Sequence, residues 1–430
     1  MDCAAVLVNK GECMEPLLEA RNLSVGIKRG HGHLAAVNGI DITINAGEIV
    51  ALVGESGCGK TFTALSIMGL LPPAAEITGG TIFFNENNPP LIAKHDPPLP
   101  ANAPAGRGAR GGRKLLGFPA GGDHEGTSIT RSTENVSGSQ SMSMTHDDGI
   151  TKRPDTREKA GQGSAGGLPQ VFARPAPPAP PGFERESCGS SLGLRGREIA
   201  MIYQEPGQSL NPLMRIGPQI AEALELHGTD KKTANSAAVD ILKKLAFVQS
   251  EKIFSAWPHQ LSGGMCQRVM IAIAAICRPR LLIADEPTSS LDTENQRHIL
   301  ALLKQINREF GTAILFISHD LSLAQDFCSR FMVMYAGNII EEGPCRELFS
   351  APLHPYTAAL VASIPRRENR GRPLANIPGN APSIEDRPRG CPFASRCPKV
   401  QERCAAELPP WTNMGGGKRV RCFFAGGGNG

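Results

Sequence analysis

Residues Gly54 to Thr61 follow the pattern G-x-x-x-x-G-K-T, which is typical of a loop that binds phosphate groups. Its glycines let backbone N–H groups point toward an anion, its lysine reaches the terminal phosphates of a nucleotide, and the hydroxyl after the lysine can coordinate Mg²⁺. An apolar segment precedes the loop and a helix-like segment follows it, which is the context that this motif needs. We therefore expect nucleotide binding by Gly54, Glu55, Ser56, Gly57, Cys58, Gly59, Lys60 and Thr61, with Thr61 also serving Mg²⁺.

Two acidic residues, Asp285 and Glu286, follow four apolar positions from Leu281 to Ala284. A short apolar run of this kind is consistent with a buried strand. Such a strand can end in two acids for purely structural reasons, but the phosphate-binding loop upstream favours a functional interpretation. We expect Asp285 to serve Mg²⁺ and Glu286 to polarise the attacking water, since a general base must lie within hydrogen-bond distance of the proton it takes.

The segment from Leu261 to Met265, with sequence LSGGM, distinguishes between classes of nucleotide-binding protein. At this point the sequence resembles the ABC ATPase family, in which LSGG marks the signature loop. The two glycines permit close backbone approach, and the serine can donate to a phosphate. The resemblance implies that Ser262, Gly263 and Gly264 contact the ATP held by a partner subunit.

The same resemblance assigns roles to residues, such as a single Gln or His, that would not indicate a function by themselves. It assigns Gln204 to the Q-loop, where it contributes to catalysis and to Mg²⁺ coordination. It assigns the segment from Ser289 to Asp292 to the D-loop, next to ATP, and His319 to the switch position that senses the γ-phosphate. The catalytic group implied is thus Glu286, His319 and Gln204.

Longer segments narrow the resemblance to one branch of the family. The sequences YQEPGQSLNP (203–212), DEPTSSLD (285–292) and HPYTAAL (354–360) are similar to those of the oligopeptide/dipeptide importer ATPases. This implies a peripheral protein at the cytoplasmic face of the inner membrane that hydrolyses ATP to power the import of di- or oligopeptides. The implied partners are a homologous ATPase subunit, in a heterodimer or homodimer, two membrane-spanning permease subunits and an extracytoplasmic substrate-binding protein.

Other functions stay open at this point. The same ATPase role could serve a nickel or glutathione importer, because the cargo is chosen by other subunits. A non-transport ABC ATPase is disfavoured because the chain has one ATPase core and no heptad repeat, and Glu286 and His319 argue against a non-catalytic ATP-binding partner. Two positions depart from the family: Ile27 replaces an aromatic that stacks on adenine, for which His31 or His33 could substitute, and Cys266 replaces a basic residue.

Four cysteines, Cys391, Cys397, Cys404 and Cys422, lie in a C-terminal segment rich in Pro and Arg. Four thiolates can hold a tetrahedral zinc ion or an iron–sulfur cluster. No pair has the C-x₂-C spacing usual in zinc modules, and no histidine lies among them. The importer resemblance implies a [4Fe–4S] cluster, with zinc and unligated thiols as alternatives.

The elements that must position these residues alternate between strands and helices, which predicts an α/β fold with a mostly parallel sheet. The family resemblance specifies a P-loop NTPase of the ABC type, with an antiparallel β subdomain and a helical subdomain. Short β segments are expected between residues 17 and 84, and strands at 47–54, 281–287 and 312–319. The segment 219–247 is expected to be helical, and helices are expected at 61–71 and 293–308. Asp292 is placed to cap the last of these, and its apolar stripe consists of Ile299, Leu302, Leu303 and Ile306.

The chain divides into five expected regions. Residues 86–194 are rich in Pro, Gly and Ser and lack sustained periodicity, so we expect a disordered insert between the two parts of the ATPase domain. A Cys-rich unit is expected to be separate from that domain. The regions are a tail (1–16), the first ATPase part (17–85), the insert (86–194), the second ATPase part (195–364) and the C-terminal region (365–430).

Composition restricts the function classes further. The 430 residues carry a formal net charge of +4, which is too small to argue for nucleic acid as a partner. No apolar run approaches the roughly 18 residues that a membrane-spanning helix needs, and the N-terminus lacks the features of a signal peptide. We therefore expect a cytosolic chain whose 12 cysteines are mostly reduced thiols or ligands.

Overall fold

A computed structural model describes residues 16–30, 32–85, 90–94, 193–289, 291–365, 371 and 375–425. Most of the expected N-terminal tail, His31 and most of the expected insert lie outside these residues. The insert was expected to begin at Glu86, but strand β5 (Ile92–Lys94) pairs with β4 (Ala75–Phe84). The antiparallel sheet therefore continues several residues beyond the expected boundary. The short strand β5 is stabilised by pairing with β4, which the sequence of β5 alone does not predict.

An eight-stranded sheet, ordered β11-β12-β10-β9-β3-β8-β7-β6, forms the centre of the fold. Its strands from β6 to β9 pair in parallel, and the remaining pairs are antiparallel. The predicted strands at 47–54, 281–287 and 312–319 are confirmed, and the last two are buried throughout, as in a sheet covered on both faces. The strands are β3 (Ile49–Val53), β6 (Ile199–Ile202), β7 (Leu281–Asp285), β8 (Ala313–Ser318), β9 (Arg330–Tyr335), β10 (Asn338–Pro344), β11 (Thr412–Gly415) and β12 (Lys418–Val420).

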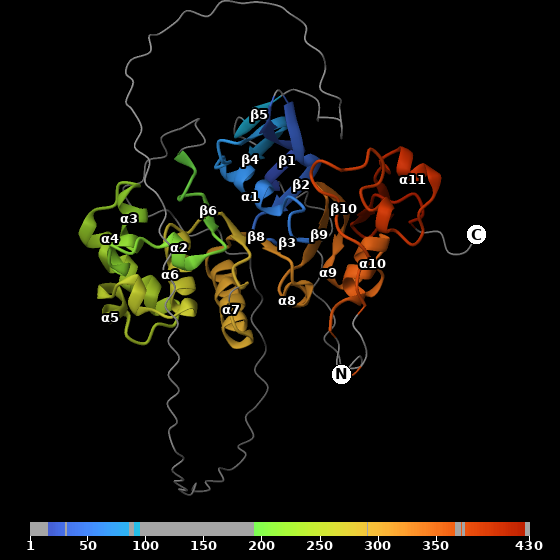
Figure 1. Cartoon of the computed structure of the whole chain (residues 1–430). Helices are drawn as coiled ribbons and strands as arrows, with labels where there is room; N and C mark the ends of the chain where they lie inside the picture. The colour runs from blue at the N-terminus through green and yellow to red at the C-terminus, as the bar shows by residue number, and fades with distance from the viewer. Residues whose placement is uncertain are drawn as a thin grey trace, which may run out of the picture. The chain divides into compact units, whose positions relative to one another are not determined.

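A second, antiparallel sheet has the order β2-β1-β4-β5 (Figure 1). Strands β1 (Pro16–Arg29) and β2 (Gly32–Asn45) are each 14 residues long, although the sequence indicated short segments. Several register shifts interrupt their pairing. Such irregularities break the alternating burial that identifies one long strand.

Helices α1 (Lys60–Met68) and α7 (Thr293–Phe310) are where the sequence predicted them, although α1 ends three residues earlier, at Met68, and is followed by Gly69 with φ 60°. Asp292 caps α7 by accepting a hydrogen bond from the backbone of Asn295, as expected. The predicted apolar stripe of α7 is buried. Shorter helices on the same part of the chain are α8 (Leu321–Gln325), α9 (Cys345–Ser350) and α10 (Pro355–Ala362).

The segment 219–247 is helical as expected, but a turn divides it into α3 (Ile216–Glu225) and α4 (Lys231–Lys244). Gly228 adopts φ 87° between them, and the Asp230 side chain starts α4 by accepting two backbone hydrogen bonds. The two helices lie together with α5 in Figure 1, and α6 contacts both these helices and β6. The other helices of this helical region are α2 (Pro206–Ser209), α5 (Ser250–Ser255) and α6 (Gly263–Ala275).

The expected separate C-terminal unit is also wrong in part, because its strands extend the central sheet. Val420 of β12 pairs with Glu341 of β10. Phe393 packs edge-on against Tyr335 of β9 and against Tyr356 of α10, with ring centroids 5.3 and 5.4 Å apart. Burial of these rings joins the C-terminal region, including α11 (Glu402–Ala406), to the same core as the sheet.

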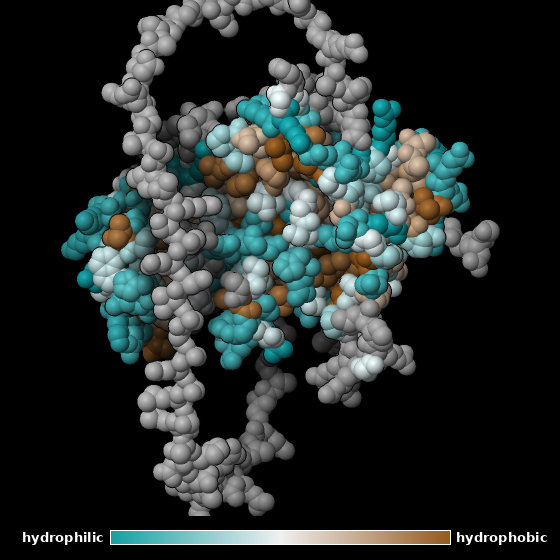
Figure 2. Space-filling model, viewed as in Figure 1, coloured by the Kyte–Doolittle hydropathy of each residue, from teal (hydrophilic) through white to brown (hydrophobic). Residues whose placement is uncertain are grey.

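No helix within the described ranges has both the length and the apolar character to cross a membrane. On the face shown in Figure 2, hydrophilic side chains separate small groups of apolar ones.

Candidate nucleotide site

Four neighbouring parallel strands end at the predicted site. In the order β3, β8, β7 and β6, they are followed by the phosphate-binding loop, His319, Glu286 and Gln204 respectively. The carboxyl ends of parallel strands meet at one edge of a sheet, which is where α/β proteins bind ligands. Sheet order therefore gathers residues that are as much as 265 positions apart, such as Gly54 and His319, at one edge.

The phosphate-binding loop packs so closely on neighbouring backbone that two of its glycines are required. A Cβ atom on Gly54 would lie 2.1 Å from the carbonyl oxygen of Met334 in β9. Gly59 has φ 114°, and a Cβ there would lie 2.9 Å from the carbonyl oxygen of Ala36. The loop thus rests on strand backbone, while Ser56 and Gly57 stay exposed at its tip.

Lys60 is held beneath this loop. Its Nζ donates to the carbonyl oxygens of Gly54, at 2.9 Å, and Glu55, at 3.1 Å, and the residue is 5% exposed. Buried Lys is ordinarily paired. Among the described residues its hydrogen bonds go to these carbonyl oxygens and, at 3.9 Å, to Cys58 Sγ, and it attracts the Asp285 carboxylate electrostatically. The ammonium therefore keeps the capacity to bind an anion.

Asp285 and Thr61 supply oxygen atoms suited to a Mg²⁺ ion. Burial raises the pKa of Asp285, a hydrogen bond from Thr61 lowers it, and nearby Glu286 raises it again. Its Oδ1 is buried without a hydrogen-bond partner. An unpaired, buried carboxylate oxygen is costly unless a cation or ordered water completes it, and Mg²⁺ prefers such hard ligands. The donors therefore fit the ion that the sequence predicted.

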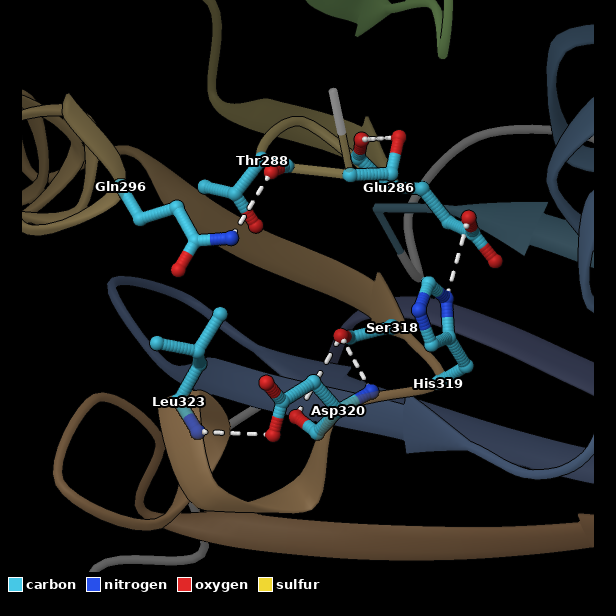
Figure 3. Close-up of a pocket in the computed structure, with 8 residues that line it drawn as sticks. Glu286, Thr288, Gln296, Ser318, His319, Asp320 and Leu323 are labelled. Atoms are coloured by element: carbon cyan, nitrogen blue, oxygen red, sulfur yellow. Dashed lines mark hydrogen bonds and ion pairs between the residues drawn. The ribbon is translucent and has the colours of Figure 1, made fainter. Parts of the chain in front are cut away.

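Glu286 lies between two of the residues assigned to catalysis. Its Oε2 accepts a hydrogen bond from Gln204 Nε2 at 3.1 Å. The same oxygen lies 3.2 Å from His319 Nδ1 (Figure 3). Glu286 has φ 46°, a conformation uncommon for a residue with a side chain and typical of functional sites. Its backbone N–H donates to Ile317, which fixes the turn after β7 against β8. The structure thus brings together the three residues predicted to be catalytic.

A pocket opens beside Glu286 and His319, and several of its lining residues were missed by the sequence analysis (Figure 3). Ser318 Oγ accepts a hydrogen bond from the Asp320 backbone, and Asp320 in turn caps α8. The polar residues Ser318 and Asp320, which flank His319 in the sequence, were the signal that could have identified this pocket. The pocket is lined by Glu286, Thr288, Ser289, Gln296, Ser318, His319, Asp320 and Leu323.

The signature residues form the exposed start of α6. Ser262 caps the helix, and it and Gly263 are exposed. A Cβ on Gly264 would lie 3.0 Å from Asn295 Oδ1, and Asn295 is held by Asp292 at the start of α7. Among the described residues, no hydrogen bond or ion pair links this helix start to the phosphate-binding loop. The signature and D-loop residues are therefore neighbours of each other, with helix N–H groups facing outward.

Two positions noted for departing from the family have local partners. Ile27 pairs with Leu34 across β1 and β2 and packs partly on the core. His33 Nε2 lies 3.0 Å from Glu76, while His31 falls outside the described residues. Cys266 is buried, with its Sγ 3.7 Å from the carbonyl oxygen of Pro258. None of these contacts involves the phosphate-binding loop.

The four C-terminal cysteines are free thiols that lie near one another. Burial and, to a lesser extent, the thiols of Cys397, Cys404 and Cys422 raise the pKa of Cys391 to about 11. Within the described part of the chain, no three Cys, His, Asp or Glu side chains are grouped so that they could hold a metal ion. As they stand, the thiols do not fit a bound zinc ion or cluster.

Comparison with known proteins decides the family. A family model described as "ABC transporter" matches residues 37–97 and 184–289, and one described as "Oligopeptide/dipeptide transporter, C-terminal region" matches 340–404. The chain is 34% identical to the oligopeptide transport ATP-binding protein OppD of Haemophilus influenzae, over 96% of this chain and 98% of that protein. It is 36% identical to AppD of Bacillus subtilis, over 96% and 97% respectively.

The chain belongs to the ATP-binding proteins of the oligopeptide/dipeptide ABC transporters. It is therefore an ABC transporter ATPase, a subunit of a larger transporter complex, with the P-loop NTPase fold of that family. Among solved structures, CbiO1 of Clostridium perfringens aligns with a TM-score of 0.49 and 18% identity, over 78% of this chain and 92% of that one.

Proposed function

We propose that this ABC transporter ATPase powers the import of di- or oligopeptides across the cytoplasmic membrane. The match of residues 340–404 to the oligopeptide/dipeptide C-terminal region is the observation that carries the cargo class. The curated relatives OppD and AppD, by their names, serve oligopeptide transport. Nickel and glutathione are the competing cargoes, because the cargo would be chosen by subunits other than this one.

We assign the nucleotide roles by position in the site. Backbone N–H groups of Ser56, Gly57 and Gly59, the Ser56 hydroxyl and Lys60 bind the phosphates of ATP, whereas the Glu55 N–H donates to Tyr356. Thr61, Asp285 and Gln204 are the Mg²⁺ ligands, and the ion would neutralise charge that develops on the phosphates. The unpaired Asp285 oxygen supports this assignment.

Hydrolysis is assigned to Glu286. Its carboxylate, held by Gln204 and His319, accepts a proton from the attacking water. His319 contacts the γ-phosphate and senses its loss. Gln204 donates to Oε2 of Glu286, and His319 Nδ1 lies beside the same oxygen, which leaves the other oxygen for the water.

The outward-facing start of α6 supports an assembly of two ATPase subunits. Ser262, Gly263 and Gly264 bind the ATP of a homologous subunit, in a heterodimer or homodimer, and Asp292 lies at the same interface. Two membrane-spanning permease subunits and an extracytoplasmic substrate-binding protein complete the transporter. The chain itself is peripheral, at the cytoplasmic face of the membrane.

Uptake by proteoliposomes tests the cargo. The chain is reconstituted with the membrane subunits that copurify with it and their binding protein, and uptake of a labelled tripeptide, nickel chelate or glutathione is measured. We expect ATP-dependent accumulation of the tripeptide, and we expect Glu286→Gln to abolish it. Accumulation of nickel or glutathione without the tripeptide would reject the cargo assignment and leave the ATPase assignment intact.

We propose a [4Fe–4S] cluster at Cys391, Cys397, Cys404 and Cys422. The proposal rests on the family resemblance and on the proximity of these four thiols. The thiols would need to move together, because they are not grouped as ligands here. Anaerobic purification with iron, zinc and sulfide analysis tests it. A broad visible absorption band with about four irons and four sulfides per chain is expected for such a cluster. A colourless protein without iron would contradict it.

A further inference from the structure

Tyr356 of α10 and Arg396 of the C-terminal region contact the phosphate-binding loop at Glu55, the second residue of the motif. The backbone N–H of Glu55 donates to the Tyr356 hydroxyl at 3.0 Å. The Glu55 carboxylate pairs with Arg396 Nη1 at 2.8 Å. Since Lys60 binds the Glu55 carbonyl, the N–H, the side chain and the carbonyl of this one loop residue all have fixed partners.

Arg396 is anchored from the side away from the loop. Its Nε and Nη2 donate to the carbonyl oxygens of Pro378 and Ile377, and its Nη1 also donates to the Tyr335 hydroxyl at 3.1 Å. Its side chain is 6% exposed, and that of Glu55 is 28% exposed. Burial alone would lower the pKa of Arg396, but its bonds to Glu55 and Tyr335 outweigh burial and raise it. A guanidinium held at four acceptors has little freedom to follow Glu55, so it fixes the position of that residue.

Tyr356 is equally constrained. It is fully buried, and its ring packs against Tyr335 and Phe393 with centroids 4.6 and 5.4 Å apart. His354 caps the helix that carries it by accepting the Tyr356 backbone N–H. The segment from His354 to Tyr356 therefore starts α10 in a position that brings the Tyr356 hydroxyl to the backbone N–H of Glu55.

We propose that Tyr356 and Arg396 are positioning residues through which α10 and the C-terminal region hold Glu55, and with it the phosphate-binding loop, in the conformation that accepts ATP. Both residues contact Glu55, so the effect passes through this residue. The proposal rests on the assignment of this loop to ATP. It gives α10 and the C-terminal region an effect on ATP affinity that is exerted through Glu55.

The test is equilibrium binding of ATP to the full chain without Mg²⁺, with hydrolysis kinetics measured on the assembled transporter. A neutral hydrogen bond is worth about 1 kcal/mol and a charged one more, so we expect about fivefold weaker binding in Tyr356→Phe and about tenfold in Arg396→Gln or Glu55→Gln. The double variant Glu55→Gln/Arg396→Gln should bind no more weakly than either single one, because both remove the same contact. The KM for ATP should rise with kcat retained.

Arg403→Gln is the matched control, because Arg403 pairs with Glu407 on the exposed face of α11 in the same region. Normal ATP binding in the Tyr356, Arg396 and Glu55 variants, with only the melting temperature lowered, would show a purely structural role and reject the proposal. If the losses of ATP affinity in the two single variants multiplied in the double variant, Glu55 and Arg396 would not act through one shared contact. Tyr356→Phe keeps its ring packing and so remains informative if the arginine variant fails to fold. Failure of the wild-type chain to bind ATP would instead contradict the nucleotide assignment itself.

Discussion

Replacing Glu286 with glutamine is expected to lower ATP hydrolysis by about 10²- to 10⁴-fold, the usual contribution of a general base. The glutamine amide can keep contacts with Gln204 and His319, whose distances to the carboxylate are 3.1 and 3.2 Å. It cannot accept a proton from water. ATP binding should be retained, because the phosphates are held by the loop after β3. Phosphate release by the assembled transporter and equilibrium ATP binding measure the two effects.

Glu309→Gln is the control for this variant. Glu309 is exposed near the end of α7 and pairs with Lys244, a surface interaction worth about 0–1 kcal/mol, so both readouts should be unchanged. Unchanged hydrolysis in Glu286→Gln would mean that the partner subunit's site does the chemistry. The chain would then be a non-catalytic ATP-binding partner, which is the alternative that the sequence left open.

Replacing Lys60 with glutamine is expected to weaken ATP binding by about 10- to 100-fold. A hydrogen bond to a charged group contributes about 1.5–3 kcal/mol, and 1.4 kcal/mol corresponds to a factor of ten. The variant also loses the contacts of the ammonium with the carbonyl oxygens of Gly54 and Glu55, so the loop itself becomes less fixed. Isothermal titration of the full chain with ATP measures the change.

Lys232→Gln serves as the comparison, because Lys232 is an exposed lysine in the first turn of α4. It should bind ATP like the unmodified chain. Equal affinity in Lys60→Gln would contradict the assignment of this lysine to the phosphates. A loss of affinity without a comparable loss of melting temperature would separate phosphate contact from support of the loop.

Sequence patterns correctly predicted the helices and strands that are determined by residues close together in the chain. The apolar run before Asp285 became a fully buried strand, and the stripe on α7, with Asp292 as its cap, faces the core as expected. The turn that divides 219–247 into two helices, and the long strands taken as short, have local causes as well. Gly228 and Asp230 gave a turn signal that the helical periodicity around them obscured, and the bulges of β1 interrupt alternation.

Family motifs carried the assignment of roles to Gln204 and His319, but only the sheet order brings them to Glu286. Strand β8 lies between β3 and β7, so His319 meets a carboxylate 33 positions earlier in the chain. Periodicity reports which face of an element is buried, whereas strand order depends on how distant elements pack. The pairing of β6 with β7, which places Gln204, is likewise absent from either segment's own pattern.

The sequence by itself determined the chemistry of this protein: the loop that binds phosphates, the two acids after a buried strand, and the family to which these motifs belong. Tertiary structure alone decided that the C-terminal region joins the central sheet and reaches that loop. Tyr356 and Arg396 contact Glu55 across 301 and 341 positions. No local pattern encodes such contacts, because they exist only when β9, α10 and the C-terminal segment pack their aromatic rings together.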